Sequence, residues 1–160
     1  DFKNFFQWQP DANGRPLVRV NGGKFRNVGI EAEYGRRLSD RLKWNVSGSY
    51  SNPRQKEMNE TYWKQAAPKL QFTTGIRYES PTWEAGTSFS FVTKRLRNRD
   101  GGLNPNIALW NAYVGYHFNK DATLRLDARN LLDRHNVITN GDYEYWGDPF
   151  TYELSYTQKF

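Results

Sequence analysis

Cysteine is absent from the 160 residues, and long apolar runs are absent as well. Without cysteine the chain has no disulfide framework, no thiolate metal site and no cysteine nucleophile. Nowhere does it approach the roughly 18 to 20 consecutive apolar residues that a membrane-spanning helix requires. A helical span is therefore excluded, and strands are the only means by which this chain could cross a membrane.

Histidine is scarce, with His117 and His135 the two examples. Neither lies in a cluster of metal-ligand residues, and no two carboxylates have the spacing of a recognisable acid and base pair. The acidic turn at 100–102 lacks the spaced carboxylates of a calcium loop. We therefore expect no catalytic site, no metal site and no cofactor, and we do not expect an enzyme.

The average composition is polar. A mean hydropathy of −0.92 and 25% charged residues are typical of soluble or disordered chains. The chain is nevertheless 16% aromatic, which disordered segments are not. A transmembrane β-barrel reconciles these values, because only every second strand residue must be apolar while the lumen and loops stay polar.

The net charge of +6 is not gathered into one basic stripe. Cations crowd one candidate loop: Lys94, Arg95, Arg97 and Arg99. Acids dominate another: Asp133, Asp142, Glu144 and Asp148. A nucleic-acid footprint would instead be a concentrated basic surface interleaved with stacking aromatics. We therefore expect no nucleic-acid partner.

The last eleven residues, 150–160, alternate between an apolar and a polar side chain until the final turn, where Gln158 falls on the apolar side. This period of two is typical of a strand with one oily and one wet side. The oily side ends on an aromatic residue and comprises Tyr152, Leu154, Tyr156 and Phe160, together with Phe150. Such an ending is typical of outer-membrane barrels, and we interpret these side chains both as the signal read by the barrel-assembly machinery and as lipid-facing groups.

The same alternation predicts eight strands, at 2–9, 27–35, 42–50, 70–79, 83–93, 108–118, 122–132 and 150–160. Short turns join three pairs of them, and long polar loops at 10–23, 51–69, 94–107 and 133–149 separate the pairs. Short periplasmic turns and long extracellular loops are typical of bacterial outer-membrane barrels, and aromatic residues near both strand ends suit two interfacial girdles. We predict an all-β, antiparallel transmembrane β-barrel. A soluble antiparallel barrel or sandwich is the alternative that periodicity alone leaves open.

Three blocks carry a family resemblance. Residues 21–31 (NGGKFRNVGIE) lead a polar loop into a strand through a Gly-aliphatic-Glu step, and residues 67–78 place a proline before a strand that ends in tyrosine. Residues 130–133 (NLLD) precede the terminal aromatic strand. Together, and in this order, they resemble the C-terminal part of TonB-dependent outer-membrane receptors. The family commonly has an aromatic residue where Leu132 stands, and residues 143–148 are not a shared motif.

The resemblance implies a barrel of twenty-two strands that encloses an N-terminal plug domain, with a TonB box ahead of the plug. Residues 1–160 are then a C-terminal segment, about the last eight strands of the larger barrel, and we expect a missing N-terminal barrel portion with the plug and TonB box. The implied location is the outer membrane of a Gram-negative cell. The implied partners are membrane lipid, lipopolysaccharide, the TonB complex acting through the plug, and a ferric siderophore or similar small ligand.

Candidate functional residues form two groups. Charged residues on the wet face are expected to face the lumen: Glu31, Glu33, Arg77, Glu79, Arg125, Asp127 and Arg129. They would line a translocation route or contact the plug, or simply form a solvated, mutually paired wall. Loop residues are expected to contact an anionic ligand or stack on it: Arg95, Arg97, Arg99, Tyr143, Tyr145 and Trp146. Contact with lipopolysaccharide phosphates and packing of loop on loop are their alternative roles.

An independent eight-stranded outer-membrane barrel, acting as adhesin, structural protein or channel, is the alternative to a receptor. A small closed barrel fills its lumen with bulky side chains. The wet faces here carry many small ones: Gly29, Gly75, Gly86, Gly115, Ser47, Ser49, Ser88 and Ser90. We interpret these small residues as the wall of a wider barrel.

Overall fold

The computed structural model describes residues 1–9, 18–58, 60–96, 102–138 and 145–159. Every regular element among them is a strand, and every strand pairing is antiparallel. In this part of the chain no helix is long and apolar enough to cross a membrane.

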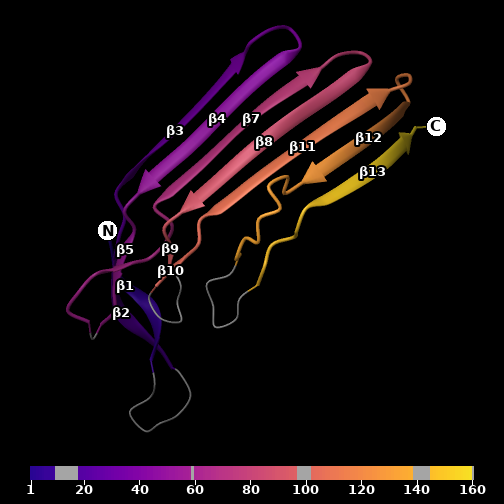
Figure 1. The fold of residues 1–160 in the computed structure, drawn as a ribbon. Coiled ribbons are helices and arrows are strands. Elements are labelled where there is room, and N and C mark those ends of the chain that lie inside the picture. The colour runs from indigo at the N-terminus through magenta and orange to yellow at the C-terminus, as the bar shows by residue number, and fades with distance from the viewer. Residues whose placement is uncertain (10–17, 59, 97–101, 139–144, 160) are drawn as a thin grey trace.

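One sheet of seven strands dominates the molecule (Figure 1). In spatial order its strands are β3 (Gly29–Arg37), β4 (Leu42–Ser51), β7 (Leu70–Glu79), β8 (Trp83–Thr93), β11 (Ile107–His117), β12 (Ala122–Arg129) and β13 (Thr151–Gln158). This spatial order follows the chain order, so the sheet is a meander. The sheet does not close on itself, and β3 and β13 form its two edges.

Two smaller sheets lie at the loop end of the large one (Figure 1). The first has the order β1 (Phe2–Gln9), β2 (Val18–Arg26), β5 (Arg54–Lys56) and β6 (Lys64–Gln65). The second pairs β9 (Arg95–Leu96) with β10 (Leu103–Asn104). Parts of three long loops are therefore ordered as β-structure.

The first predicted wall strand is placed differently from the prediction. Residues 2–9 do form a strand, but β1 pairs with β2, which lies largely in the segment predicted to be a loop. The alternation of β1 is weak because two phenylalanines are adjacent, and its register shifts around Phe5. The wall within this chain consequently has seven strands, and β1 does not supply the eighth that a small closed barrel requires.

The three short turns share one device. Ser39 Oγ accepts hydrogen bonds from the backbone N–H groups of Arg41 (3.3 Å) and Leu42 (3.1 Å). Ser80 Oγ accepts one from the N–H of Trp83 (2.9 Å). Asn119 Oδ1 accepts hydrogen bonds from the N–H groups of Asp121 (2.8 Å) and Ala122 (2.9 Å). A side-chain oxygen thus satisfies the backbone donors of each turn. Because the turns are tight, they also fix the strand register.

The register sorts the side chains into an apolar face and a polar face. One row of the apolar face crosses six strands: Leu42, Tyr78, Ala85, Val114, Leu126 and Leu154. Large members of this face are exposed, with Ile30 at 69% and Tyr152 at 74% of full accessibility. Within the described residues the buried apolar side chains are Ala108, Ala122 and Val137. A sheet with so little interior and so much exposed apolar area requires an apolar medium on that face, which disfavours a soluble sandwich.

Candidate functional site: the polar wall and the loop junction

The polar face of the large sheet brings the predicted lumen residues together. The cross-strand register places all seven on it: Glu31, Glu33, Arg77, Glu79, Arg125, Asp127 and Arg129. They come from three strands: two each from β3 and β7, and three from β12. In a wall whose apolar face meets lipid, this face is the inner one.

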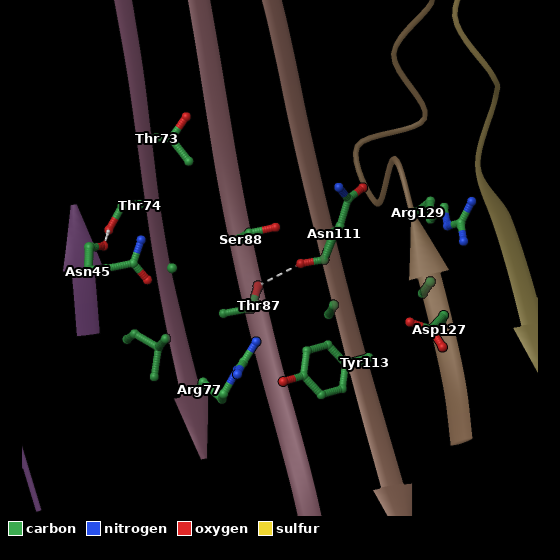
Figure 2. Close-up of a pocket in the computed structure, with 14 residues that line it drawn as sticks. Asn45, Thr73, Thr74, Arg77, Thr87, Ser88, Asn111, Tyr113, Asp127 and Arg129 are labelled. Atoms are coloured by element: carbon green, nitrogen blue, oxygen red, sulfur yellow. Dashed lines mark hydrogen bonds between the residues drawn. The ribbon is translucent and has the colours of Figure 1, made fainter. Parts of the chain in front are cut away.

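Two shallow grooves run along the polar face. The first, of about 370 Å³, crosses β4, β7, β8, β11 and β12, and Figure 2 shows its lining. Small neutral side chains line its middle, Arg77 and Asp127 lie toward its turn-side end, and Arg129 lies on its β12 side. The lining includes Asn45, Thr73, Ser88, Asn111, Arg77, Tyr113, Asp127 and Arg129. The second groove, of about 390 Å³, lies beside Glu31 and Glu33 on β3. Both grooves suit hydrated polar contacts better than an apolar ligand.

Arg125 is the centre of the densest charge cluster on this wall. Its Nε and Nη2 donate to the two carboxylate oxygens of Asp127 at 2.7 and 2.8 Å. Its Nη1 donates to Glu84 Oε1 at 2.9 Å. The guanidinium also lies 3.8 Å from the ring centroid of Tyr113. This bidentate and stacked arrangement fixes Arg125 in the wall, which agrees with a paired and solvated lining.

Two glycines in the wall make room for this cluster. A Cβ atom on Gly86 would lie 2.5 Å from Cε1 of Tyr113, and one on Gly115 would lie 2.7 Å from Cγ of Glu84. Tyr113 reaches from β11 toward β8 across the place where a side chain at position 86 would stand (Figure 2). These two positions are therefore slots for larger neighbours, and their small size has a local packing reason besides the width of the barrel.

The other predicted charges differ in their partners. Glu79 pairs with Lys43 Nζ at 3.3 Å and with Arg77 Nη1 at 3.4 Å. Arg129 pairs with Glu153 at 3.6 Å. Across the parts of the chain that the structure describes, Glu31 and Glu33 have no ion-pair partner, and they face serines of β4 instead. Among the described wall residues, Glu31 and Glu33 are therefore the acids whose charge is available for an ion pair with another part of the protein or with a ligand.

The loop end of the sheet is held by buried polar side chains. Arg95 is 8% exposed and donates to the carbonyl oxygen of Val137, and burial lowers the pKa of its guanidinium. Asn136 is 6% exposed and forms two 3.3 Å hydrogen bonds with Ala108, to its N–H and to its carbonyl. Arg95 therefore fastens one loop to another. Its predicted contact with a ligand stays a prediction.

Asn130 is the centre of this junction and is 1% exposed. Its Nδ2 donates to the carbonyl oxygens of Arg134 and Asp148, both at 3.0 Å, and its Oδ1 accepts from the N–H of Arg134 at 3.2 Å. Its backbone has a φ of 51°, in the region where asparagine is one of the few tolerated residues. Asp133, with a φ of 46°, accepts from the N–H of Phe150 at 2.9 Å. The NLLD block thus connects both ends of the last loop to the C-terminal end of β12.

The aromatic loop candidates are described in part. Trp146 forms a bridge with Val137 and contacts the ring of His135 edge to face at 5.8 Å between centroids. Tyr145 accepts from the N–H of Ile138 through its carbonyl at 2.8 Å. The side chains of Tyr145 and Trp146 are 63% and 55% exposed, so both remain accessible to a ligand. The predicted contacts Arg97, Arg99 and Tyr143 and the terminal Phe160 lie outside the described residues.

Sequence reasoning missed the roles of Glu84, Tyr113, Asn130 and Asn136. A signal for Asn130 existed, because the NLLD block carried the resemblance, but its function as a junction depends on contacts eighteen residues away. For Glu84 and Tyr113 the signal was the glycine opposite each of them, which appears only once the register is known.

An antiparallel sheet with an apolar outer face, a polar inner face, short turns at one end and long loops at the other defines an open section of a transmembrane β-barrel wall. The sequence matches the family described as TonB dependent receptor-like, beta-barrel, over residues 1–131. The chain belongs to this family, which is a family of outer-membrane transporters and receptors.

Solved structures share the fold over almost the whole chain. One described as the copper transporter OprC is 18% identical, with a TM-score of 0.70 over 99% of this chain and 27% of its own. The ferric-catecholate import receptor Fiu from K12 E. coli is 18% identical, with a TM-score of 0.73 over 99% and 24%. The ferric citrate transporter FecA in the unliganded form is 23% identical, with a TM-score of 0.76 over 98% and 27%. The chain therefore spans about a quarter of each of these proteins. No curated protein matches the sequence.

Proposed function

We propose that residues 1–160 are the C-terminal section of the barrel wall of a TonB-dependent receptor that takes up a scarce nutrient, a ferric siderophore, across the outer membrane. Two of the similar solved structures are described as ferric-catecholate and ferric citrate proteins, and a third as a copper transporter. Nutrient uptake is common to all three descriptions. The choice of a ferric siderophore as the ligand is the more specific part of the proposal.

The observation that carries the proposal is the open, two-faced sheet. The edges β3 and β13 expose unpaired backbone donors and acceptors, which cost several kcal/mol each in hydrocarbon. Further barrel strands from a longer receptor would pair with both edges, and a plug domain within that barrel would meet the polar wall. Glu31 and Glu33 are the wall residues with charge available for such a contact.

The proposal sets the orientation and the partners. The short turns face the periplasm and the loops face the exterior, where lipopolysaccharide lies. The TonB complex would act through the plug domain and TonB box. The barrel-assembly machinery would recognise the terminal strand through Tyr152, Leu154, Tyr156 and Phe160. Ligand contact at the loops would fall to Tyr145 and Trp146 together with Arg95, Arg97, Arg99 and Tyr143.

Growth on defined metal sources tests this function. A strain lacking the intact receptor should lose growth on one ferric siderophore as the sole iron source, and the intact gene should restore it only when TonB is present. The double substitution Tyr145→Ala, Trp146→Ala should weaken binding of that siderophore about tenfold or more, since loop aromatics supply stacking and hydrogen bonds. Loss of copper uptake alone would replace siderophore by copper. Unchanged uptake of every metal source would contradict the receptor proposal.

A further inference from the structure

The outer face of the seven-stranded sheet carries a single charged side chain. Along all seven strands the register assigns this face to apolar, aromatic, threonine, glycine or glutamine residues, with the exception of Arg36. A guanidinium in hydrocarbon is costly, so a charge on this face must reach the membrane surface or find a counter-charge. Arg36 stands one residue before the end of β3, on the turn side.

Arg36 lies beside a fixed aromatic platform. It is paired across the strands with Trp44. The Trp44 indole donates from Nε1 to Thr74 Oγ1 at 2.9 Å and meets the ring of Tyr34 edge to face at 5.7 Å. Tryptophan and tyrosine at the end of barrel strands mark the level of the lipid headgroups. The register thus places Arg36 at the level at which a headgroup phosphate would lie.

A second unpaired cation comes from the adjoining turn. Arg41 lies close enough to the Tyr78 hydroxyl to interact with it electrostatically, and Tyr78 is on the outer face. Within the described residues neither Arg36 nor Arg41 has an acidic partner, whereas the inward cations of this turn do. Arg37 pairs with Asp40 at 3.6 Å and Lys43 with Glu79 at 3.3 Å. Among the described residues of this turn, Arg36 and Arg41 are therefore the cations whose charge no carboxylate neutralises.

The other two turns lack this charge. In windows of eight residues, residues 77–84 (RYESPTWE) carry one cation and two acids, and residues 116–123 (YHFNKDAT) carry one cation and one acid. The first turn, residues 36–43 (RRLSDRLK), has four cations and one acid. Positive charge is therefore concentrated at one point on the turn side of the wall.

We propose that Arg36 and Arg41 bind the phosphate of an anionic phospholipid at the turn-side surface of the membrane. The guanidinium groups match phosphate oxygens, and Tyr34, Trp44 and the half-exposed Leu38 contact the glycerol and the upper acyl chains. The proposal rests on the proposed function for its choice of leaflet, because the periplasmic side of the outer membrane is the phospholipid side.

Native mass spectrometry of the intact, delipidated receptor tests this site with added phosphatidylglycerol or phosphatidylcholine. Wild-type receptor should retain phosphatidylglycerol in preference to phosphatidylcholine. The double variant Arg36→Gln, Arg41→Gln should bind phosphatidylglycerol roughly 10- to 30-fold more weakly, since each cation near an anionic surface contributes measurably. The matched control is Arg37→Gln in the same turn on the opposite face, which should retain wild-type affinity.

Three outcomes would overturn the proposal: equal affinity for the two lipids, unchanged binding in the double variant, or an equal loss in the Arg37→Gln control. A preference for lipid A over phosphatidylglycerol would overturn the assignment to phospholipid. Because headgroup binding is measured on purified receptor, its failure leaves nutrient uptake untouched, and failure of uptake leaves the lipid measurement valid.

Discussion

At the residue scale, the outer face solves a problem that lipid poses for polar side chains. Trp44 Nε1 donates to Thr74 Oγ1 at 2.9 Å, and that hydroxyl donates to the carbonyl of Asn45 at 2.9 Å. The same chain recurs two strands away, where Trp110 Nε1 donates to Thr87 Oγ1 at 2.6 Å and the hydroxyl donates to the carbonyl of Asn111 at 3.0 Å. In both cases the threonine hydroxyl accepts a hydrogen bond from the indole N–H and donates one to a backbone carbonyl, so neither of these two indole donors faces hydrocarbon unpaired.

Substituting Thr74 by valine should leave the Trp44 indole N–H without its acceptor on the lipid face. We expect a loss of about 1 to 3 kcal/mol in the free energy of unfolding of the intact receptor, measured by urea titration in lipid vesicles with tryptophan fluorescence. Thr73→Val is the matched control on the polar face, where its 3.3 Å contact with Ser90 is open to water. An equal loss of unfolding free energy in the two variants would show that the Trp44–Thr74 hydrogen bond contributes no more to stability than a contact on the polar face.

At the element scale, the last loop is organised by the end of β12 rather than by its own strands. Asn130 closes three hydrogen bonds to the two limbs of the loop from a backbone with positive φ. Position 130 needs a residue that tolerates a positive φ and that can both donate and accept hydrogen bonds. Asparagine meets both requirements.

Replacing Asn130 separates these two needs. Asn130→Gly keeps the backbone conformation and loses the side-chain hydrogen bonds, whereas Asn130→Ala loses both. We expect hydrogen exchange in residues 134–138 and 145–150 of the intact receptor to accelerate about tenfold or more in the glycine variant and further in the alanine variant. Leu132→Ala, at a position that is 43% exposed, is the control and should leave exchange near the wild-type rate. The reverse order of the two Asn130 variants would argue against backbone strain.

The wall strands and their turns follow from local sequence, whereas β2 and the loop contacts do not. Alternation predicts the faces of the seven wall strands, and Ser39, Ser80 and Asn119 mark their turns, because both signals are local. Val18–Arg26 was missed as a strand since its alternation breaks at Asn21 and two glycines, and its pairing with β1 and β5 supplies what the local pattern lacks. Arg95 is predicted to contact a ligand because it lies in an arginine-rich loop, and that contact stays a prediction. Its burial against Val137 depends on a partner 42 residues away.

At the scale of the whole molecule, stability depends on lateral pairing rather than on an interior. Ala108, Ala122 and Val137 are the buried apolar residues of the described chain, so there is little core to hold the sheet if its edges stay open. Each inner strand is flanked on both sides by backbone hydrogen bonds, and the two edge strands are flanked on one side only.

Residues 1–160 expressed alone and refolded in lipid vesicles should therefore fail to give a stable monomer, because open edges in hydrocarbon are costly. We expect oligomers through β3 and β13, or a chain that migrates as unfolded in unheated SDS gels. The intact receptor is the control and should migrate as a compact, heat-modifiable band. A monodisperse, heat-modifiable species formed by residues 1–160 would favour the small independent barrel.

The slots at Gly86 and Gly115 set the clearance inside the barrel. Because Tyr113 and Glu84 occupy the space directly above these two backbones, two bulky side chains add little thickness to the wall. The open cross-section of the barrel interior at Gly86 and Gly115 then depends more on the path of the backbone than on the size of Tyr113 and Glu84. An alanine at either position would tilt its neighbour inward and narrow the passage for whatever the barrel encloses.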